Sequence, residues 1–166
     1  MKPSAKILFS ILIIIGCVIA YSVADAGKAA PKKPSKNTLT DAVPAEVAYI
    51  IDGDTFAAKV IVSDKVTISV RVRMMQIDAP ELHGECDAEI KHAFAARDRL
   101  GQLLPIGSRI TLSNVKDDKY LGRIDAYVEN ASGDDVGDTM VKEKMARPYS
   151  GGKRVPWCGP NGEFAY

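Results

Sequence analysis

After residue 42 the chain alternates between apolar and polar side chains, and this pattern predicts β-strands. Three segments rich in β-branched residues follow one another closely, at residues 43–51, 55–62 and 66–73. In the third segment every second residue from Val66 to Val72 is Val or Ile, and the residues between them are polar. Alternation with a period of two is typical of a strand with one buried face. We therefore expect a three-stranded meander.

The period of the pattern then changes. Apolar residues recur every three to four positions across residues 87–104, which predicts an amphipathic helix that ends before Pro105. Residues 108–115 and 124–129 again predict strands, and residues 138–145 predict a short helix. This order predicts a β-rich α+β fold, a five-stranded OB-fold barrel with a helix between strands three and four and a short helix after strand five. Such barrels commonly bind oligonucleotides, although a fold alone does not establish a function.

The first 26 residues differ in composition from the rest. Two lysines precede an apolar run at residues 7–20, and Ala24 and Ala26 give a small-x-small ending. These features predict a secretory signal peptide cleaved after Ala26, and hence an exported protein, periplasmic or secreted. Two alternatives remain open. Residues 7–24 are long enough to stay as a membrane anchor, and the sequence before Cys17 loosely resembles a lipoprotein cleavage site.

Residues 27–42 are rich in Lys, Pro, Ala and Ser, and they predict a flexible cationic linker before a folded domain at residues 43–166. The whole chain carries 22 Lys and Arg against 21 Asp and Glu. Because the leader holds two lysines and one aspartate, the remainder has 20 of each and is formally neutral. Any binding of nucleic acid must therefore depend on a local cluster of basic residues.

Two of the three cysteines lie outside the leader. Cys86 and Cys158 would meet in an oxidising compartment, where a disulfide between them is expected. The alternative is a metal site that uses both thiols. A tetrahedral zinc site needs further thiolate or imidazole ligands at short spacing, and His83 and His92 do not supply that pattern.

The segments 51–55 (IDGDT) and 78–81 (DAPE) carry the first candidate chemistry. Each alone is compatible with an ordinary turn. In a meander, however, the turn before strand two and the end of strand three lie at the same end of the sheet, so Asp54 and Asp78 can converge. Two convergent carboxylates repel each other unless a cation lies between them, and hard oxygen ligands suit Ca²⁺ or Mg²⁺.

Two arginines complete the pattern. Arg73 precedes Asp78 on the polar face of the third strand, and Arg123 begins the last strand after the charged segment 117–123. A divalent cation, a carboxylate such as Glu81 that accepts a proton from water, and two guanidinium groups suit attack on a phosphodiester.

The chain thus holds three motifs, at residues 51–55, 73–81 and 118–123. In this order, and with the predicted strands and helix between them, they resemble the staphylococcal nuclease (thermonuclease) family over about residues 47–149. The resemblance implies a nuclease that hydrolyses DNA and RNA with little sequence preference and leaves 3′-phosphates. It implies Ca²⁺ as the cofactor, held by Asp54, Asp78 and the carbonyl of Ala79. Glu81 matches the general base or the group that orients the attacking water.

The resemblance also assigns the residues that hold the substrate. Arg73 and Arg123 match the pair that neutralises the scissile phosphate. Lys119, Tyr120 and Tyr149 match the region that contacts the nucleotide. The expected partner is DNA or RNA, preferably single-stranded; we expect a monomer without an obligate protein partner, and membrane attachment only through the leader.

The sequence departs from the family pattern at three places. Ala79 stands where threonine is common, and Leu121 is an extra residue between Tyr120 and Gly122. The chain ends soon after Cys158, so we expect the tail, tied to the first helix, to replace the packing of a C-terminal helix.

Two functions without catalysis compete with the nuclease. One is an OB-fold module that binds single-stranded nucleic acid, which relies on stacking aromatics and a basic groove. The formal neutrality of residues 27–166 and a content of only 7% aromatic residues argue against it. The other is an envelope protein that uses the barrel for protein contacts, and only the apolar leader favours that alternative.

Overall fold

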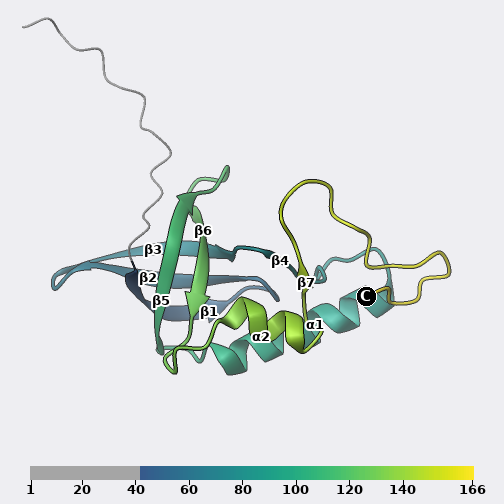
Figure 1. The fold of residues 1–166 in the computed structure, drawn as a ribbon, viewed down its shortest axis with the longest axis horizontal. Helices are drawn as coiled ribbons and strands as arrows, with labels where there is room; N and C mark the ends of the chain where they lie inside the picture. Colours follow the sequence, from purple (N-terminus) through teal and green to yellow (C-terminus); the bar gives the residue numbers. More distant parts are fainter. Residues whose placement is uncertain (1–41) are drawn as a thin grey trace, which may run out of the picture. The chain divides into compact units, whose positions relative to one another are not determined.

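The computed structural model describes residues 42–166, and in this part of the chain five strands close into a barrel (Figure 1). The strands are β1 (Val43–Ile50), β2 (Thr55–Ser63), β3 (Val66–Met74), β5 (Arg109–Asp117) and β6 (Arg123–Glu129). Their order is β1-β2-β3-β6-β5; β3 and β6 are parallel, and the other neighbours are antiparallel. The predicted five-stranded OB-type barrel is confirmed.

The predictions for the leader and for the linker up to residue 41 lie outside the described residues. Within residues 42–166, no helix combines the length and the hydropathy needed to cross a membrane.

The hairpin of β2 and β3 extends beyond the closed part of the barrel (Figure 1). Val72, near the barrel end of β3, is fully buried, whereas Ile68 on the same face is 51% exposed. The apolar stripe of β3 therefore contributes to the core only at the end that carries Arg73.

Two helices lie against one end of the barrel. Helix α1 (Asp87–Leu103) confirms the helix predicted at 87–104, and its buried Ala96 and Leu100 join Phe56 of β2 in one core. Helix α2 (Val136–Lys142) begins two residues before the predicted start.

The bounds of α2 have local causes. The Asp135 side chain accepts a hydrogen bond from the Asp138 N–H at 2.8 Å, which caps the helix earlier than the apolar pattern indicated. Lys144 adopts a left-handed φ of 59°, and the Met145 N–H bonds back to the Met140 carbonyl, so the helix ends before the predicted Met145.

The prediction that Asp78 closes the third strand is wrong. Strand β3 ends at Met74, and Gln76 adopts a φ of 63°, which interrupts the extended chain. Asp78 instead lies in a separate short strand, β4 (Ile77–Asp78), which pairs with β7 (Arg147–Pro148). The tail therefore starts with a strand that supports Asp78.

The C-terminal tail folds back onto the start of α1, as Figure 1 shows. Phe164 stacks on His92 of α1 with ring centroids 3.6 Å apart, and the Tyr166 hydroxyl donates to the Ala146 carbonyl at 2.9 Å. Cys158 is joined to Cys86, the residue that precedes α1. These contacts agree with the expectation that the tail supplies packing at this helix.

Candidate active site

Asp54 and Asp78 converge at one end of the barrel, where the turn before β2 meets β4. The guanidinium group of Arg73 connects them: its Nη2 atom lies 3.0 Å from Asp54 Oδ2 and 3.8 Å from Asp78 Oδ1. The convergence expected from the meander therefore occurs, although Asp78 reaches the site from β4.

Asp54 is held in place by its surroundings. Its carboxylate accepts hydrogen bonds from the Ala79 N–H at 2.9 Å and from the Thr55 hydroxyl at 3.0 Å. The preceding Gly53 packs so closely that a Cβ atom there would lie 2.7 Å from Ala79 Cβ and 2.8 Å from Ala96 Cβ. The glycine of this turn is thus required by the close approach of α1 to the site.

Arg73 is equally constrained. Its Nη1 atom donates to the carbonyls of Met74 and Ile77, at 2.8 and 3.0 Å, and its side chain is only 12% exposed. Since these carbonyls belong to the end of β3 and to β4, the turn that separates the two strands also positions the guanidinium group.

The positive charges near the two aspartates do not fully offset the cost of burying their carboxylates. Burial raises the pKa of Asp54 to about 7, even though the charge of Arg73 acts in the opposite direction. Burial likewise raises the pKa of Asp78, against the charges of Arg154 and Arg73. Buried carboxylates whose ionised form is under-compensated suit a hard divalent cation.

One oxygen of Asp78 takes part in no hydrogen bond within the described residues. Asp78 Oδ1 is buried and accepts no hydrogen bond within residues 42–166; its close contacts to arginine are ion pairs without hydrogen-bond geometry. Asp54, Asp78 and the carbonyl of Ala79 offer only oxygen donors, as Ca²⁺ and Mg²⁺ prefer.

Two residues of the tail enter the site that sequence reasoning did not place there. Arg154 Nε lies 2.9 Å from Asp78 Oδ1, and its Nη1 atom pairs with Glu81 Oε1. The indole Nε1–H of Trp157 donates to Asp78 Oδ2 at 3.2 Å. The one signal that could have found them is the expected bond of Cys158 to Cys86, which brings the tail beside the segment after Glu81.

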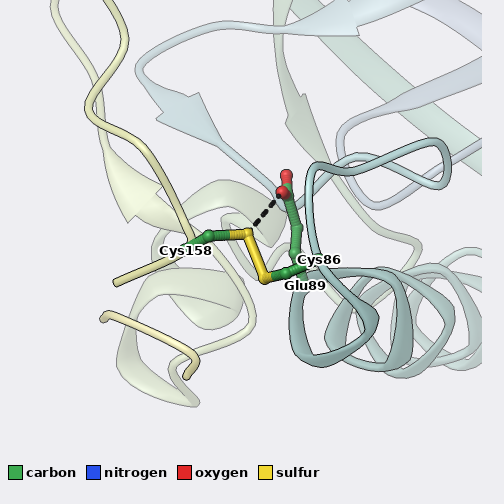
Figure 2. Close-up of side chains that lie close together, drawn as sticks. All are labelled: Cys86, Glu89 and Cys158. Carbon is green, nitrogen blue, oxygen red and sulfur yellow. Dashed lines mark hydrogen bonds between the residues drawn. A yellow bond between two sulfur atoms is a disulfide. The ribbon is translucent and has the colours of Figure 1, made fainter. Parts of the chain in front are cut away.

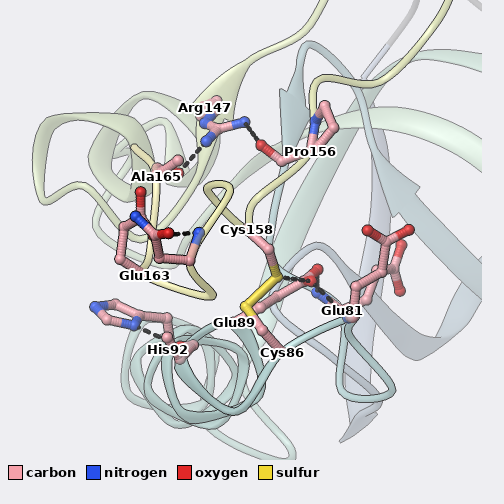
Figure 3. The surroundings of a disulfide bond; sticks show 12 residues. Glu81, Cys86, Glu89, His92, Arg147, Pro156, Cys158, Glu163 and Ala165 are labelled. Atoms are coloured by element: carbon pink, nitrogen blue, oxygen red, sulfur yellow. Dashed lines mark hydrogen bonds between the residues drawn. A yellow bond between two sulfur atoms is a disulfide. The ribbon is translucent and has the colours of Figure 1, made fainter.

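The loop that carries Glu81 is fastened by Glu89 of α1. The buried Glu89 carboxylate accepts from the Glu81 N–H at 3.2 Å and from the Glu85 N–H at 2.9 Å. Figures 2 and 3 show this carboxylate beside the Cys86–Cys158 bond. Cys158 Sγ lies 3.4 Å from Glu89 Oε2. A disulfide sulfur carries no proton, so this last approach is a contact only.

The pairing of the cysteines also bears on the metal site considered for them. Cys86, Glu89 and Cys158 have the spacing of a three-ligand site, but the two sulfurs are bonded to each other at 2.09 Å. Their thiolates are therefore not available as ligands in this structure.

Arg123 lies on the strand beside Arg73 but belongs to a separate ion pair. Its Nε atom donates to Asp118 Oδ2 at 2.8 Å, and its guanidinium carbon lies 4.4 Å from the centroid of the Tyr120 ring. In the parallel register of β3 and β6, Arg73 is opposite Asp125, two residues after Arg123. Only the first of the two predicted arginines therefore contacts the aspartates.

Asp118 and Asp125 link the two arginines electrostatically. Burial acts to raise the pKa of Asp118, but hydrogen bonds from Arg123, the Tyr120 N–H and Asp125 outweigh it and the pKa is lowered. The pKa of Asp125 is raised, by burial first and by Asp118 second, while the charges of Arg123 and Arg73 oppose the shift. The surface between the two guanidinium groups is thus charged and partly buried.

A cavity of about 490 Å³ opens beside Arg73. Its lining includes Asp125, Lys116 and two tyrosines, Tyr127 and the predicted Tyr149. The Tyr149 hydroxyl donates to the Gly152 carbonyl at 2.7 Å, and its N–H to the Gln76 carbonyl. The size and lining suit a nucleotide-sized group next to an anion-binding arginine.

Lys119 and Tyr120 do not line this cavity. They lie on the turn between β5 and β6, where Lys119 Nζ is 4.9 Å from the Tyr120 ring centroid. The extra residue Leu121 is 99% exposed at the tip of that turn. The extra residue therefore lies on the exposed turn, and the start of β6 keeps Arg123 in register with β3.

Comparison with known proteins identifies one family. The family described as staphylococcal nuclease homologue matches residues 71–155. No curated protein matches the chain.

Proposed function

Because the chain belongs to the staphylococcal nuclease homologue family, we propose that it is an exported, Ca²⁺-dependent nuclease that hydrolyses phosphodiester bonds in DNA and RNA. The observation that carries the proposal is the contact of Arg73 with both Asp54 and Asp78. Family membership alone is compatible with a nuclease-like domain or with an OB-fold domain that only binds nucleic acid.

In this proposal Asp54, Asp78 and the carbonyl of Ala79 hold the cation. When bound, Ca²⁺ supplies positive charge next to the phosphoryl oxygens and polarises them. The raised pKa values of Asp54 and Asp78 support this assignment, since a cation relieves the cost of burying both charges.

The arginines bind the phosphate. Arg73 is immobilised by two backbone carbonyls, so its charge is in place before the substrate arrives. In the described part of the chain, the hydrogen bond of Arg123 uses only Nε, which leaves both Nη groups to bind phosphate oxygens as a fork.

Glu81 takes the proton of the attacking water. Its side chain is 49% exposed, so water has access to it, and its backbone N–H is tied to Glu89. This exposed position at the rim of the site leaves room for a water molecule beside the carboxylate, as a general base requires.

Export is the second component of the proposal. It rests on the signal-like residues 1–26 and is supported by the pairing of Cys86 with Cys158, since a structural disulfide persists in an oxidising compartment.

The test is cleavage of single-stranded DNA and of RNA by the purified full-length protein in Ca²⁺, in Mg²⁺ and in EGTA. We expect cleavage that requires Ca²⁺ and stops with EGTA, and loss of cleavage in Asp78→Asn but not in the matched surface variant Asp64→Asn. A folded, oxidised protein that binds single-stranded DNA and never cleaves it would instead be the OB-fold binding module.

A further inference from the structure

Asp78 is the point where two cations would compete. Its Oδ2 atom already accepts a hydrogen bond from the indole of Trp157, whereas Oδ1 accepts none and has more lone-pair capacity for a metal. The guanidinium group of Arg154 lies against this same oxygen, with Nε 2.9 Å away, and also against Glu81.

Arg154 is held differently from Arg73. Arg73 is fixed by two backbone carbonyls and is 12% exposed. Within residues 42–166, the Arg154 side chain makes its polar contacts only to carboxylates, and it is 44% exposed. Of the two guanidinium groups at Asp78, Arg154 is the one that can move into solvent.

The backbone next to Arg154 is anchored on one side. Arg147 Nη1 donates to the carbonyls of Val155 and Pro156, both at 3.2 Å, and Cys158 is bonded to Cys86 (Figure 3). The tail therefore keeps the Arg154 side chain within reach of Asp78 even when the side chain leaves it.

We propose that Arg154 is an internal competitor for the metal: its guanidinium group occupies Asp78 and Glu81 in the metal-free protein and must leave Asp78 Oδ1 before a divalent cation binds. This inference rests on the proposed function, and it names a residue that sets metal affinity. Two cations on one carboxylate oxygen repel each other strongly in a partly buried site.

The competition has a simple quantitative form. If metal binds only the fraction of molecules in which Arg154 has left Asp78, the apparent Kd exceeds the intrinsic Kd by the inverse of that fraction. A contact that is formed about 90% of the time raises the apparent Kd roughly tenfold.

The test measures Ca²⁺ binding to the full-length, oxidised protein by calorimetry. We expect Arg154→Gln to bind Ca²⁺ roughly tenfold more tightly than the wild type. The matched control is Lys153→Gln, which removes the same charge from an exposed neighbouring position and should leave the Kd unchanged. Arg154→Lys, which keeps a positive charge, should bind with an intermediate Kd.

Trp157 supplies a second readout at the site. It is the only tryptophan of the chain and is hydrogen-bonded to Asp78, so Ca²⁺ binding should change its fluorescence, with the same order of Kd values among the variants. Circular dichroism checks that each variant is folded.

Equal or weaker Ca²⁺ binding by Arg154→Gln would overturn the inference. If the wild type binds Ca²⁺ and cleaves DNA in that case, the proposed function stands and only the competition fails. If neither protein binds Ca²⁺, both proposals fail together.

Discussion

The two sides of the candidate site are built by different means. The barrel half, Asp54 and Arg73, is held by backbone hydrogen bonds and by the close approach of Gly53 to α1. The tail half, Arg154 and Trp157, reaches the site from near the end of the chain beside the Cys86–Cys158 bond. Asp78 lies between the two halves and contacts both.

The difference shows that similar groups serve different purposes according to how they are fixed. Arg73 cannot leave without breaking two hydrogen bonds to the backbone, so it provides a permanent charge. Arg154 can exchange its carboxylates for solvent, so it provides a charge that another cation can replace. The barrel half thus holds its charged groups in fixed positions. The tail half places on Asp78 a positive charge that a metal ion can replace.

Removing the disulfide should have the largest expected effect, because it releases the tail half and leaves the barrel half intact. In the double variant Cys86→Ser/Cys158→Ser we expect the free energy of unfolding to fall by roughly 4 kcal/mol, because the bond closes a loop of 72 residues in the unfolded chain. Urea denaturation followed by circular dichroism measures this change. Cys17→Ser is the control, and an unchanged midpoint in the double variant would show that the tail half is held without the bond.

Glu81→Gln tests the group that carries the proposed chemistry and contacts Arg154 of the tail half. We expect turnover to fall by between about 10² and 10⁴, since the amide cannot accept a proton from water, while the fold is retained. Steady-state cleavage of single-stranded DNA gives the rate. Glu85→Gln, in the same exposed loop, should keep nearly full turnover, and wild-type turnover in Glu81→Gln would remove Glu81 from the mechanism.

Arg123→Ala tests the arginine that belongs to neither half. We expect turnover to fall by roughly 10², because one phosphate-binding fork is lost, and the Kd for Ca²⁺ to stay nearly unchanged. Cleavage rates and calorimetry separate the two effects. Arg71, opposite Arg123 in the β3–β6 register, provides the control variant Arg71→Ala; an equal loss in both variants would indicate a general effect of surface charge.

A pH series tests whether Asp54 has the raised pKa that its burial implies. Its pKa is about 7 in the folded protein and near 3.8 when unperturbed, so the metal-free native state binds more protons than the unfolded state between these values. The contribution of Asp54 to stability is therefore present at low pH and lost as pH rises toward 7.

Asp54→Asn should remove that loss, and each unit by which the pKa is raised corresponds to about 1.4 kcal/mol of stability. The difference between wild type and Asp54→Asn in urea midpoint, measured in EGTA from pH 4 to pH 8, gives the effect. Asp64→Asn, on the exposed turn between β2 and β3, should keep the wild-type dependence. A difference that is constant across the series would contradict the raised pKa of Asp54.

The barrel and its half of the site could be predicted because local patterns encode them. Alternation marks β2 and β3, the spacing of apolar residues marks α1, and the turn before β2 brings Asp54 toward Arg73. The bend at Gln76 was not predictable in this way, since its left-handed conformation is not favoured by the residue type. As a result the separate strand β4 was missed, although Asp78 still reached the site.

The tail half carries no comparable pattern. Arg154 lies among glycines, a lysine and prolines, and its position follows from the Cys158 bond, the Trp157 hydrogen bond and the stacking of Phe164 on His92. These are contacts between residues far apart in sequence, and no periodicity indicates them. The expected pairing of the cysteines was the only long-range signal, and it located the tail without identifying which side chain enters the site.

The projecting hairpin of β2 and β3 has a practical consequence for handling the protein. Strand β2 starts at the Asp54 turn and runs to Ser63, so its far end lies roughly 26 Å from the site at the usual rise per residue. Exposed turns accept insertions and chemical attachment far better than packed segments. A dye, a surface tether or a short peptide tag placed at Asp64–Lys65 should therefore leave the end of the barrel that carries the candidate site accessible.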